Sequence, residues 1–269
     1  MNKAIFCDLD KTLFDNNRNF SPLTLETVNL IQAKGIPFIP STARAAKNTI
    51  EVARQLNVDK YDGYVVSNKG CSIYSFKTNS FLLDITLTKE EIKEIFNFTY
   101  QKYKTSFFSN NSTYVNEYNE VTHKWTTWTQ TNYHIVTNPE EITENIKTIV
   151  ISLEVGLNDK ETKTFIKDLQ QLWPKLDVVS YYKNTFFQIS CKEISKGSVL
   201  QFLAQHLGVD VTNTYAFGDS HNDLELIRDA GRGLAVSNAI DELKAIADKI
   251  ILSNQEDGPA KYLRQHFDI

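Results

Sequence analysis

The sequence has few of the residues that mark specialised protein classes. It contains only three cysteines, at positions 7, 71 and 191, and their odd number and wide spacing support neither a disulfide framework nor a zinc site. Ten glycines and six prolines among 269 residues exclude a fibrous or low-complexity chain. With 41% hydrophobic and 23% charged residues, the composition is that of an ordinary globular protein with a substantial core.

Long apolar runs and runs of basic residues are also missing. No apolar run approaches the ~18 residues of a membrane span, and the first residues lack the charged, apolar and small-residue regions of a signal peptide. There is no Lys/Arg-rich segment, and the formal net charge is −4, which disfavours nucleic acid as a partner. We therefore expect a cytoplasmic protein that binds neither membranes nor nucleic acid.

Apolar runs alternate with helical patterns at both ends of the chain. The run KAIFCDLD, residues 3–10, predicts a strand buried on both faces. Ser21 and Pro22 then begin a helix, and a second strand is followed by a helix over residues 45–56. The same alternation returns near the C-terminus. This pattern predicts an α/β fold, a Rossmann-like three-layer core with a parallel sheet.

The middle of the chain follows a different pattern. A hairpin turning at Asn68–Gly70 leads into a helix over 88–104, a polar aromatic stretch over 118–134 and a helix over 159–172, with extended segments between them. We interpret residues 84–187 as an inserted α+β domain, and residues 1–83 and 188–269 as the α/β core that carries it.

Two aspartates follow the first strand at the spacing FCDLDKTLF, residues 6–14. Residues two apart on a strand point to the same face, so Asp8 and Asp10 would leave the sheet together at its carboxyl end, where open α/β sheets bind ligands. Two such close carboxylates repel each other unless a cation lies between them, and a hard ion such as Mg²⁺ suits them. Taken alone, an aspartate pair of this kind fits a simple turn equally well.

A second acidic cluster favours the ligand interpretation. FGDSHND, residues 217–223, follows another apolar run and brings Asp219, Asn222 and Asp223 to a strand end. Thr42 ends the second strand, and Lys196 begins a helix, where the helix dipole does not favour a positive charge. Carboxylates, a hydroxyl and a lysine around a divalent cation match the needs of phosphoryl transfer.

In order along the chain, DLDKT at 8–12, STAR at 41–44, Lys196-Gly197 and GDSHND at 218–223 resemble the four motifs of the haloacid dehalogenase superfamily of phosphatases. The insertion between the second and third motifs is similar to the large α+β cap of its Cof-type branch, subfamily IIB. The resemblance implies that residues 84–187 are a cap domain that determines substrate specificity and that residues 1–83 and 188–269 are the catalytic core. AGRGLAVSNA at 230–239 and EDGPAKYL at 256–263 also resemble that branch.

The resemblance implies a role for each matching residue. Asp8 would be the nucleophile and a Mg²⁺ ligand, Asp10 the general acid and base and a metal ligand through its backbone carbonyl, and Asp219 the third protein ligand. Asp223 would orient Lys196 or a metal-bound water. The groups implied to hold the phosphate are Thr42, Lys196, Asn222 and the backbone at Leu9 and Ala43.

The sequence departs from the Cof-type pattern at two places. Ala43 replaces the usual glycine of the second motif, which requires that its backbone not need a positive φ. In the hairpin, Lys69 separates Asn68 from Gly70 where the branch has Asn-Gly, so the pattern does not assign Asn68 a substrate contact.

These features predict a Mg²⁺-dependent phosphatase of small phosphate monoesters, in particular sugar phosphates, that forms an aspartyl phosphate. Three alternatives stay open: a phosphomutase of sugar phosphates, a glycosyltransferase with a D-x-D metal site, and a non-enzymatic phosphoacceptor switch. The sequence leaves the oligomeric state undetermined.

Overall fold

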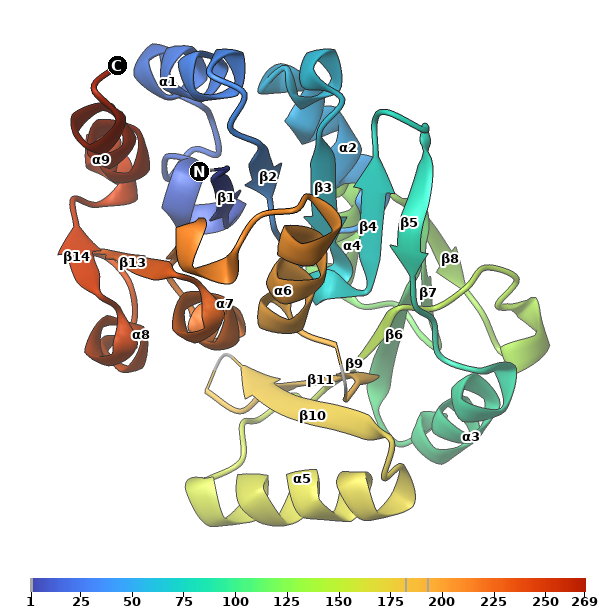
Figure 1. The fold of residues 1–269 in the computed structure, drawn as a ribbon. Coiled ribbons are helices and arrows are strands. Elements are labelled where there is room, and N and C mark those ends of the chain that lie inside the picture. The colour runs from blue at the N-terminus through green and yellow to red at the C-terminus, as the bar shows by residue number, and fades with distance from the viewer. Residues whose placement is uncertain (1, 182, 193) are drawn as a thin grey trace. The chain divides into compact units, whose positions relative to one another are not determined.

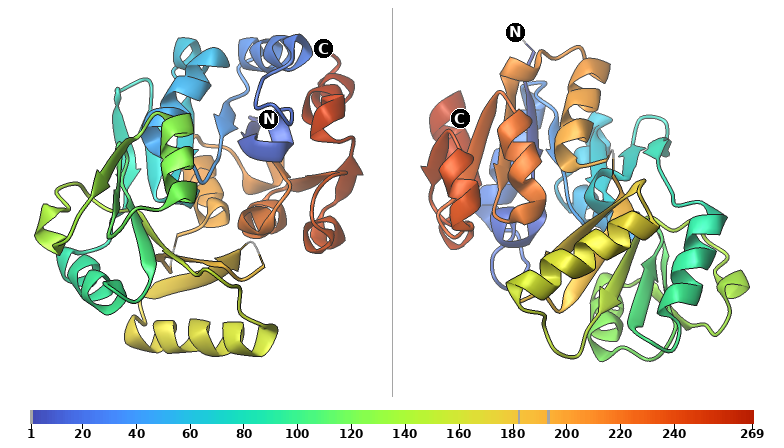
Figure 2. Two further views of the ribbon diagram at one scale, coloured as in Figure 1. Left: turned by 180° about the vertical axis from the view of Figure 1, so that it is seen from behind. Right: turned by 90° about the horizontal axis from the view of Figure 1, so that it is seen from below.

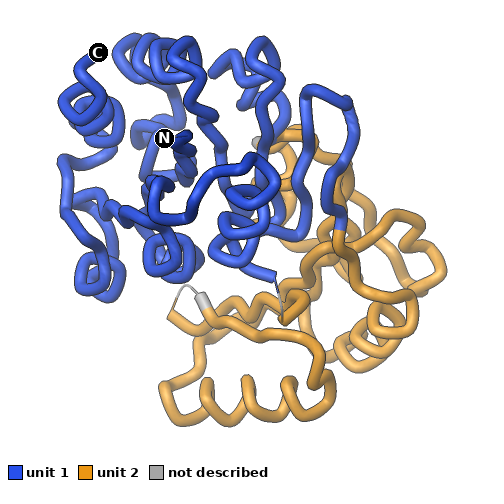
Figure 3. The backbone as a smooth tube through the Cα atoms, in the orientation of Figure 1, with its two compact units in different colours: residues 1–44, 49–84, 194–269 blue, residues 45–48, 85–193 orange. Residues whose placement is uncertain are grey.

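The computed structural model describes residues 2–181, 183–192 and 194–269, with only the backbone at positions 128 and 181. Contacts within the chain divide it into two compact units, coloured separately in Figure 3. The first comprises residues 1–44, 49–84 and 194–269, and the second comprises residues 45–48 and 85–193. Each unit contains a hydrophobic cluster of its own.

A parallel sheet forms the centre of the first unit (Figure 1). Its strands are β1 (Ala4–Cys7), β2 (Phe38–Pro40), β12 (Thr214–Gly218), β13 (Arg232–Val236) and β14 (Lys249–Ile251). Their order is β14-β13-β12-β1-β2, and all the pairings are parallel. β1 and β12 are buried along their whole length, as a strand covered on both faces must be.

Helices cover both faces of this sheet. They are α1 (Pro22–Ala33), α2 (Ala46–Gln55), α6 (Lys196–His206), α7 (Leu224–Asp229), α8 (Asp241–Ile246) and α9 (Gly258–Phe267). α1 packs beside α9, while α7 packs between α6 and α8 (Figures 1 and 2). The predicted α/β three-layer core is therefore confirmed. The predicted start of α1 is confirmed too, since the Ser21 hydroxyl caps the helix by accepting from the Thr24 N–H at 3.0 Å.

A small antiparallel sheet completes the first unit. Its strands are β3 (Tyr64–Ser67), β4 (Ser72–Ser75) and β5 (Ser80–Asp84). The predicted hairpin turn lies between β3 and β4, where Asn68, Lys69 and Gly70 have φ values of 51°, 59° and 107°. A Cβ added to Gly70 would lie 2.8 Å from the Ser195 carbonyl oxygen, so only glycine allows this turn to contact the start of α6.

The second unit is built on a six-stranded sheet with the order β10-β11-β9-β6-β7-β8. The strands are β6 (Lys104–Phe108), β7 (Ser112–Val115), β8 (Asn132–Ile135), β9 (Thr148–Ser152), β10 (Leu176–Tyr181) and β11 (Phe186–Cys191), and the helices are α3 (Lys89–Thr99), α4 (Glu120–Thr129) and α5 (Asp159–Leu172). All the pairings are antiparallel except that of β7 with β8.

Several elements of the second unit differ from the sequence predictions. α3 ends at Thr99 instead of 104, because Tyr100 leaves the helical conformation. α4 lies in the stretch for which we predicted no element, and its start is capped by the Asn119 side chain. α5 has the predicted bounds.

No helix among the described residues is long and apolar enough to cross a bilayer.

Replacing Phe107 by alanine should destabilise the second unit by about 3–5 kcal/mol, because this β6 side chain is fully buried in the unit's hydrophobic cluster. All three tryptophans of the chain lie within residues 85–193, so their fluorescence during urea unfolding reports on this unit. Ile135→Ala in β8 of the same unit is the matched control, since Ile135 is 55% exposed and its replacement should cost less than about 1 kcal/mol. Equal shifts for both variants would contradict the assignment of this core.

Candidate active site

Two aspartates lie where the strand order of the parallel sheet reverses. From β1 the chain continues to β2 on one side, whereas from β12 it continues to β13 and β14 on the other. Asp8 follows β1 and Asp219 follows β12, and the Asp8 N–H donates to the Phe217 carbonyl at 3.0 Å. In open α/β sheets this is the point at which the strand ends leave a crevice for a ligand.

A buried lysine connects two of the carboxylates. Lys196, the first residue of α6, donates from Nζ to Oδ1 of Asp8 and to Oδ1 of Asp223, each at 2.6 Å. The Lys196 and Asp223 side chains are fully buried, and that of Asp8 is 6% exposed. A lysine at a helix start is unfavourable for the helix dipole, and here the two carboxylates compensate for it.

Asp223 uses both of its oxygens to organise the site. Oδ1 accepts from Lys196, while Oδ2 accepts from the backbone N–H groups of Asp219 and Ser220, both at 3.1 Å. The loop after β12 is thereby folded around the Asp223 carboxylate. Asp219 is held further by Thr12, whose hydroxyl donates to its Oδ1 at 3.3 Å.

The carboxylates of the site carry more negative charge than Lys196 neutralises. Burial raises the pKa of Asp8 well above its usual range, an effect opposed by Lys196 and reinforced by Asp223 and Asp219. Burial and the charge of Asp223 raise the pKa of Asp219 to about 7. The pKa of Lys196 is raised because Asp223 and Asp8 outweigh the effect of its burial. The site therefore favours a bound cation.

The donor set fits a hard divalent cation such as Mg²⁺. Asp8, Asp219 and Asp223 can each bring one carboxylate oxygen within 4.8 Å of the others. Asp223 already accepts hydrogen bonds at both oxygens, whereas Oδ2 of Asp8 and Oδ2 of Asp219 accept none from the described residues. Asp8 and Asp219 are thus the side chains that could hold the ion, and two positive charges would balance the excess.

Asp10 lies apart from this carboxylate group. Its side chain is 35% exposed and is bound by Arg44, which donates from Nε to Oδ2 at 2.7 Å and from Nη2 to Oδ1 at 2.6 Å. It belongs to a single wide turn over Leu9–Leu13, in which the Phe14 N–H donates to the Leu9 carbonyl and Lys11 has φ 61°. The turn separates Asp10 from Asp8, although the two are only two residues apart.

The remaining predicted residues surround the same strand ends. Thr42 is buried just after β2, and its hydroxyl accepts from the Arg44 N–H at 3.3 Å. Ala43 is exposed and does not have a positive φ, so its backbone does not need the family's glycine. Asn222 is half-buried, and its Oδ1 accepts from the Ser220 hydroxyl at 2.8 Å. Asn68 donates from Nδ2 to the Ser72 hydroxyl at 3.2 Å.

Sequence reasoning gave no role to two residues of this site. Thr12 and Arg44 both belong to quoted motifs, but a motif shows which residues lie near a site and not which partners they bind. The sequence feature that could have pointed to Thr12 is its position four residues after Asp8. For Arg44, it is a positively charged residue two positions after Thr42.

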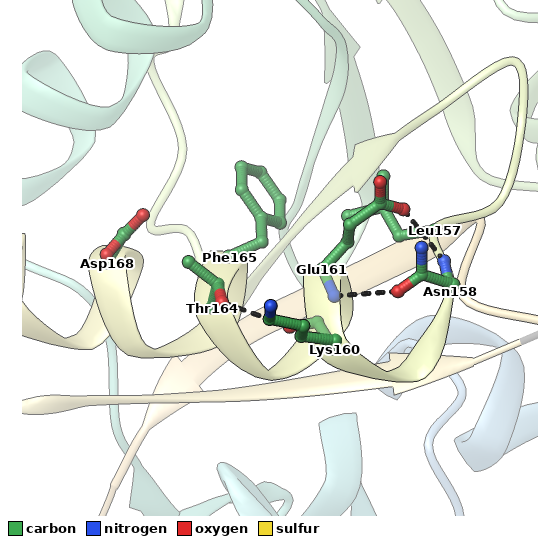
Figure 4. Close-up of a pocket in the computed structure, with 7 residues that line it drawn as sticks. All are labelled: Leu157, Asn158, Lys160, Glu161, Thr164, Phe165 and Asp168. Atoms are coloured by element: carbon green, nitrogen blue, oxygen red, sulfur yellow. Dashed lines mark hydrogen bonds between the residues drawn. The ribbon is translucent and has the colours of Figure 1, made fainter.

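The second unit has a separate surface hollow of about 480 Å³ along α5. Figure 4 shows its lining, which includes Asn158 and Glu161 in a reciprocal helix cap. Each of these side chains accepts a hydrogen bond from the backbone N–H of the other residue, which is a structural role in starting the helix. The carboxylates of the first unit are the better candidate.

The raised pKa of Asp219 predicts a pH-dependent stability for the protein in chelator. Between the pKa of an unfolded aspartate, 3.8, and about 7 in the fold, the folded state binds more protons, so its stability falls as pH rises. The full effect on the free energy of unfolding is a few kcal/mol at most. Asp219→Asn should flatten this slope in urea unfolding from pH 4.5 to 8. If the free energy of unfolding changed with pH equally in the wild type and in Asp219→Asn, the prediction would be wrong.

A family model of the haloacid dehalogenase-like hydrolases matches residues 5–263. A Haemophilus influenzae protein named "Putative phosphatase" is 27% identical over 283 residues, covering 99% of each chain. The 5-amino-6-(5-phospho-D-ribitylamino)uracil phosphatase YcsE of Bacillus subtilis is 25% identical, with 97% of this chain and 94% of that protein covered.

Solved structures share the fold. That of BT4131, described as a sugar phosphatase of subclass IIB of this superfamily, has a TM-score of 0.81 with 22% identity and covers 99% of each chain. The resemblance inferred from the four motifs is confirmed. The chain belongs to the haloacid dehalogenase-like hydrolases.

Proposed function

We propose that this protein is a Mg²⁺-dependent phosphatase that hydrolyses small phosphate monoesters through an aspartyl phosphate on Asp8. The observation that carries the proposal is the buried contact of Lys196 with Asp8 and Asp223 beside Asp219. A lysine that contacts a strand-end aspartate keeps that carboxylate charged and oriented for attack on a phosphoryl group. The family membership and the phosphatase relatives support the same reaction.

Asp8 is the nucleophile in this proposal. One oxygen of its carboxylate attacks phosphorus, and the bond from phosphorus to the ester oxygen breaks with the electron pair going to that ester oxygen. Asp10 supplies a proton to this leaving oxygen. In the second step a water attacks the aspartyl phosphate, Asp10 takes the proton of that water, and inorganic phosphate leaves with the Asp8 carboxylate restored.

The phosphate is held by groups at the neighbouring strand ends. We assign this role to the Thr42 hydroxyl, the Lys196 ammonium, the Asn222 amide and the backbone N–H groups of Leu9 and Ala43. Asp223 acts by positioning Lys196. When bound by Asp8, Asp219 and the Asp10 carbonyl, Mg²⁺ supplies positive charge to the phosphoryl oxygens.

Sugar phosphates are the substrates that we favour. YcsE acts on a phosphorylated ribityl compound and BT4131 is a sugar phosphatase, so both act on polyhydroxylated phosphate esters. In our proposal, the inserted domain, residues 84–187 by the sequence pattern, selects the leaving group. The residues assigned to the phosphoryl group and the metal cannot distinguish one ester from another.

Purified protein should release inorganic phosphate from members of a panel of hexose phosphates, pentose phosphates, AMP and pyridoxal phosphate in Mg²⁺, with sugar phosphates turned over fastest. Excess EDTA should abolish release, because without the cation the aspartate carboxylates repel the negatively charged phosphoryl group. Formation of an isomeric sugar phosphate without free phosphate would identify a mutase. No reaction with any ester, or full activity in EDTA, would overturn the proposal.

Asp8→Asn should lower phosphate release by more than about 10³-fold, because an amide is neither a nucleophile nor an anionic ligand. Asp62→Asn is the control for the chemical change, since Asp62 is exposed and its left-handed backbone also suits asparagine. Circular dichroism would verify that both variants are folded. Substantial turnover by folded Asp8→Asn protein would exclude Asp8 as the nucleophile.

A further inference from the structure

We propose that Arg44 is a positioning residue that orients the Asp10 carboxyl group for proton transfer. The inference rests on the function proposed above, in which Asp10 is the acid and base. It extends that function by naming the residue that keeps the partly exposed Asp10 carboxylate in one orientation.

The contact between the two side chains is bidentate. Nε of Arg44 donates to Oδ2 of Asp10 at 2.7 Å, and Nη2 donates to Oδ1 at 2.6 Å. A planar guanidinium that binds both oxygens of a carboxylate fixes its rotation as well as its position. A single hydrogen bond or a lysine would leave the carboxylate free to turn.

Arg44 can orient Asp10 because it is itself held in place. Its side chain is only 2% exposed, and its guanidinium lies 4.7 Å from the centre of the Phe14 ring. Its backbone is fixed on both sides, since its N–H donates to the Thr42 hydroxyl and its carbonyl accepts from the Asn68 N–H at 2.8 Å. The rigid partner of the pair is therefore the arginine.

Arg18 lies on the same carboxylate but cannot play this role. Its Nε is 3.8 Å from Oδ1 of Asp10, and its side chain is 45% exposed. An exposed ion pair at this distance contributes little to orientation. Arg18 therefore offers a matched control, in which a neighbouring positive charge is removed while the Arg44 fork remains.

The geometry favours positioning over direct phosphate binding. The Nε and Nη2 groups of Arg44, which form its fork, are both engaged by Asp10. An arginine that bound phosphate with this fork would have to release Asp10. The two roles differ in their kinetics, because a positioning residue affects only steps in which Asp10 moves a proton, whereas a phosphate-binding residue affects every ester.

The first turnover of aryl phosphates separates these roles. The ester oxygen of 4-nitrophenyl phosphate leaves without a proton, whereas that of phenyl phosphate needs one from Asp10 as its bond to phosphorus breaks. In Arg44→Gln, single-turnover release of phenol should slow by about 10- to 100-fold and release of 4-nitrophenol by less than about 3-fold. The loss for phenol is smaller than the ~10²- to 10⁴-fold contribution of a general acid, because the Asp10 carboxyl group is still present. Arg18→Gln should slow neither.

A double-mutant cycle provides the second readout. In an Asp10→Asn background, Arg44→Gln should slow phenol release by less than about 2-fold further, because its effect acts through the carboxylate that has been removed. Arg44→Lys keeps the positive charge but cannot form two parallel hydrogen bonds, so its kinetics should resemble those of Arg44→Gln. The lysine variant replaces the glutamine variant in this test if the glutamine variant does not fold.

Equal losses for both esters with a raised KM, or additive losses in the cycle, would show that Arg44 binds phosphate and overturn the inference. A wild-type protein inactive on both aryl phosphates would instead overturn the proposed function itself. The two failures are therefore distinguishable.

Discussion

The buried ammonium of Lys196 is the interaction on which the rest of the site depends. Three carboxylates could not share one sheet edge without it, since isolated buried charges are very unfavourable. The fold brings this lysine in through close backbone packing on both sides of α6. A Cβ on Gly70 would lie 2.8 Å from the Ser195 carbonyl, and one on Gly197 would lie 2.7 Å from the Glu225 carbonyl. Two glycines thus allow the helix to reach the carboxylates.

Asp8 and Asp10 show how environment gives different chemistry to identical side chains. Asp8 is buried against a lysine, whereas Asp10 is partly exposed and bound by the guanidinium of Arg44. The wide turn at Leu9–Leu13, with Lys11 in the left-handed region, is what sends the two carboxylates to different partners. A regular strand would have placed them side by side, and neither could then have been assigned a separate role.

Much of the first unit could be predicted from the sequence, because its signals are local. The apolar run at β1, the Ser21-Pro22 helix start and the positions of Asp8 and Asp219 after strands are enough to place these aspartates at one sheet edge. The partners of the side chains could not be predicted in this way. The resemblance gave Lys196 or a metal-bound water as the partner of Asp223. Nothing local indicates that Lys196 also binds Asp8, or that Arg44 binds Asp10, because these choices depend on loop geometry.

The second unit was less predictable. α4 combines threonine, tryptophan and charged residues without a clear helical period, so its helix depends on the Asn119 cap and on packing. α5, by contrast, begins with a reciprocal cap between Asn158 and Glu161 and has a clear polar face, and its bounds were predicted correctly. α5 could be predicted because its cap and its polar–apolar pattern both indicate a helix, whereas in α4 only the cap does.

The site joins distant parts of the chain, and this orders its assembly during synthesis. Thr12 and Asp219 are 207 residues apart, yet they are hydrogen-bonded. At ~5–20 residues per second, a ribosome needs ~10–40 s to add the residues between them. During that time β1 lacks β12, so one of its edges has unpaired backbone groups, and Asp8 lacks its lysine until α6 emerges. The carboxylate site is therefore incomplete until the last third of the chain has folded onto the first strand.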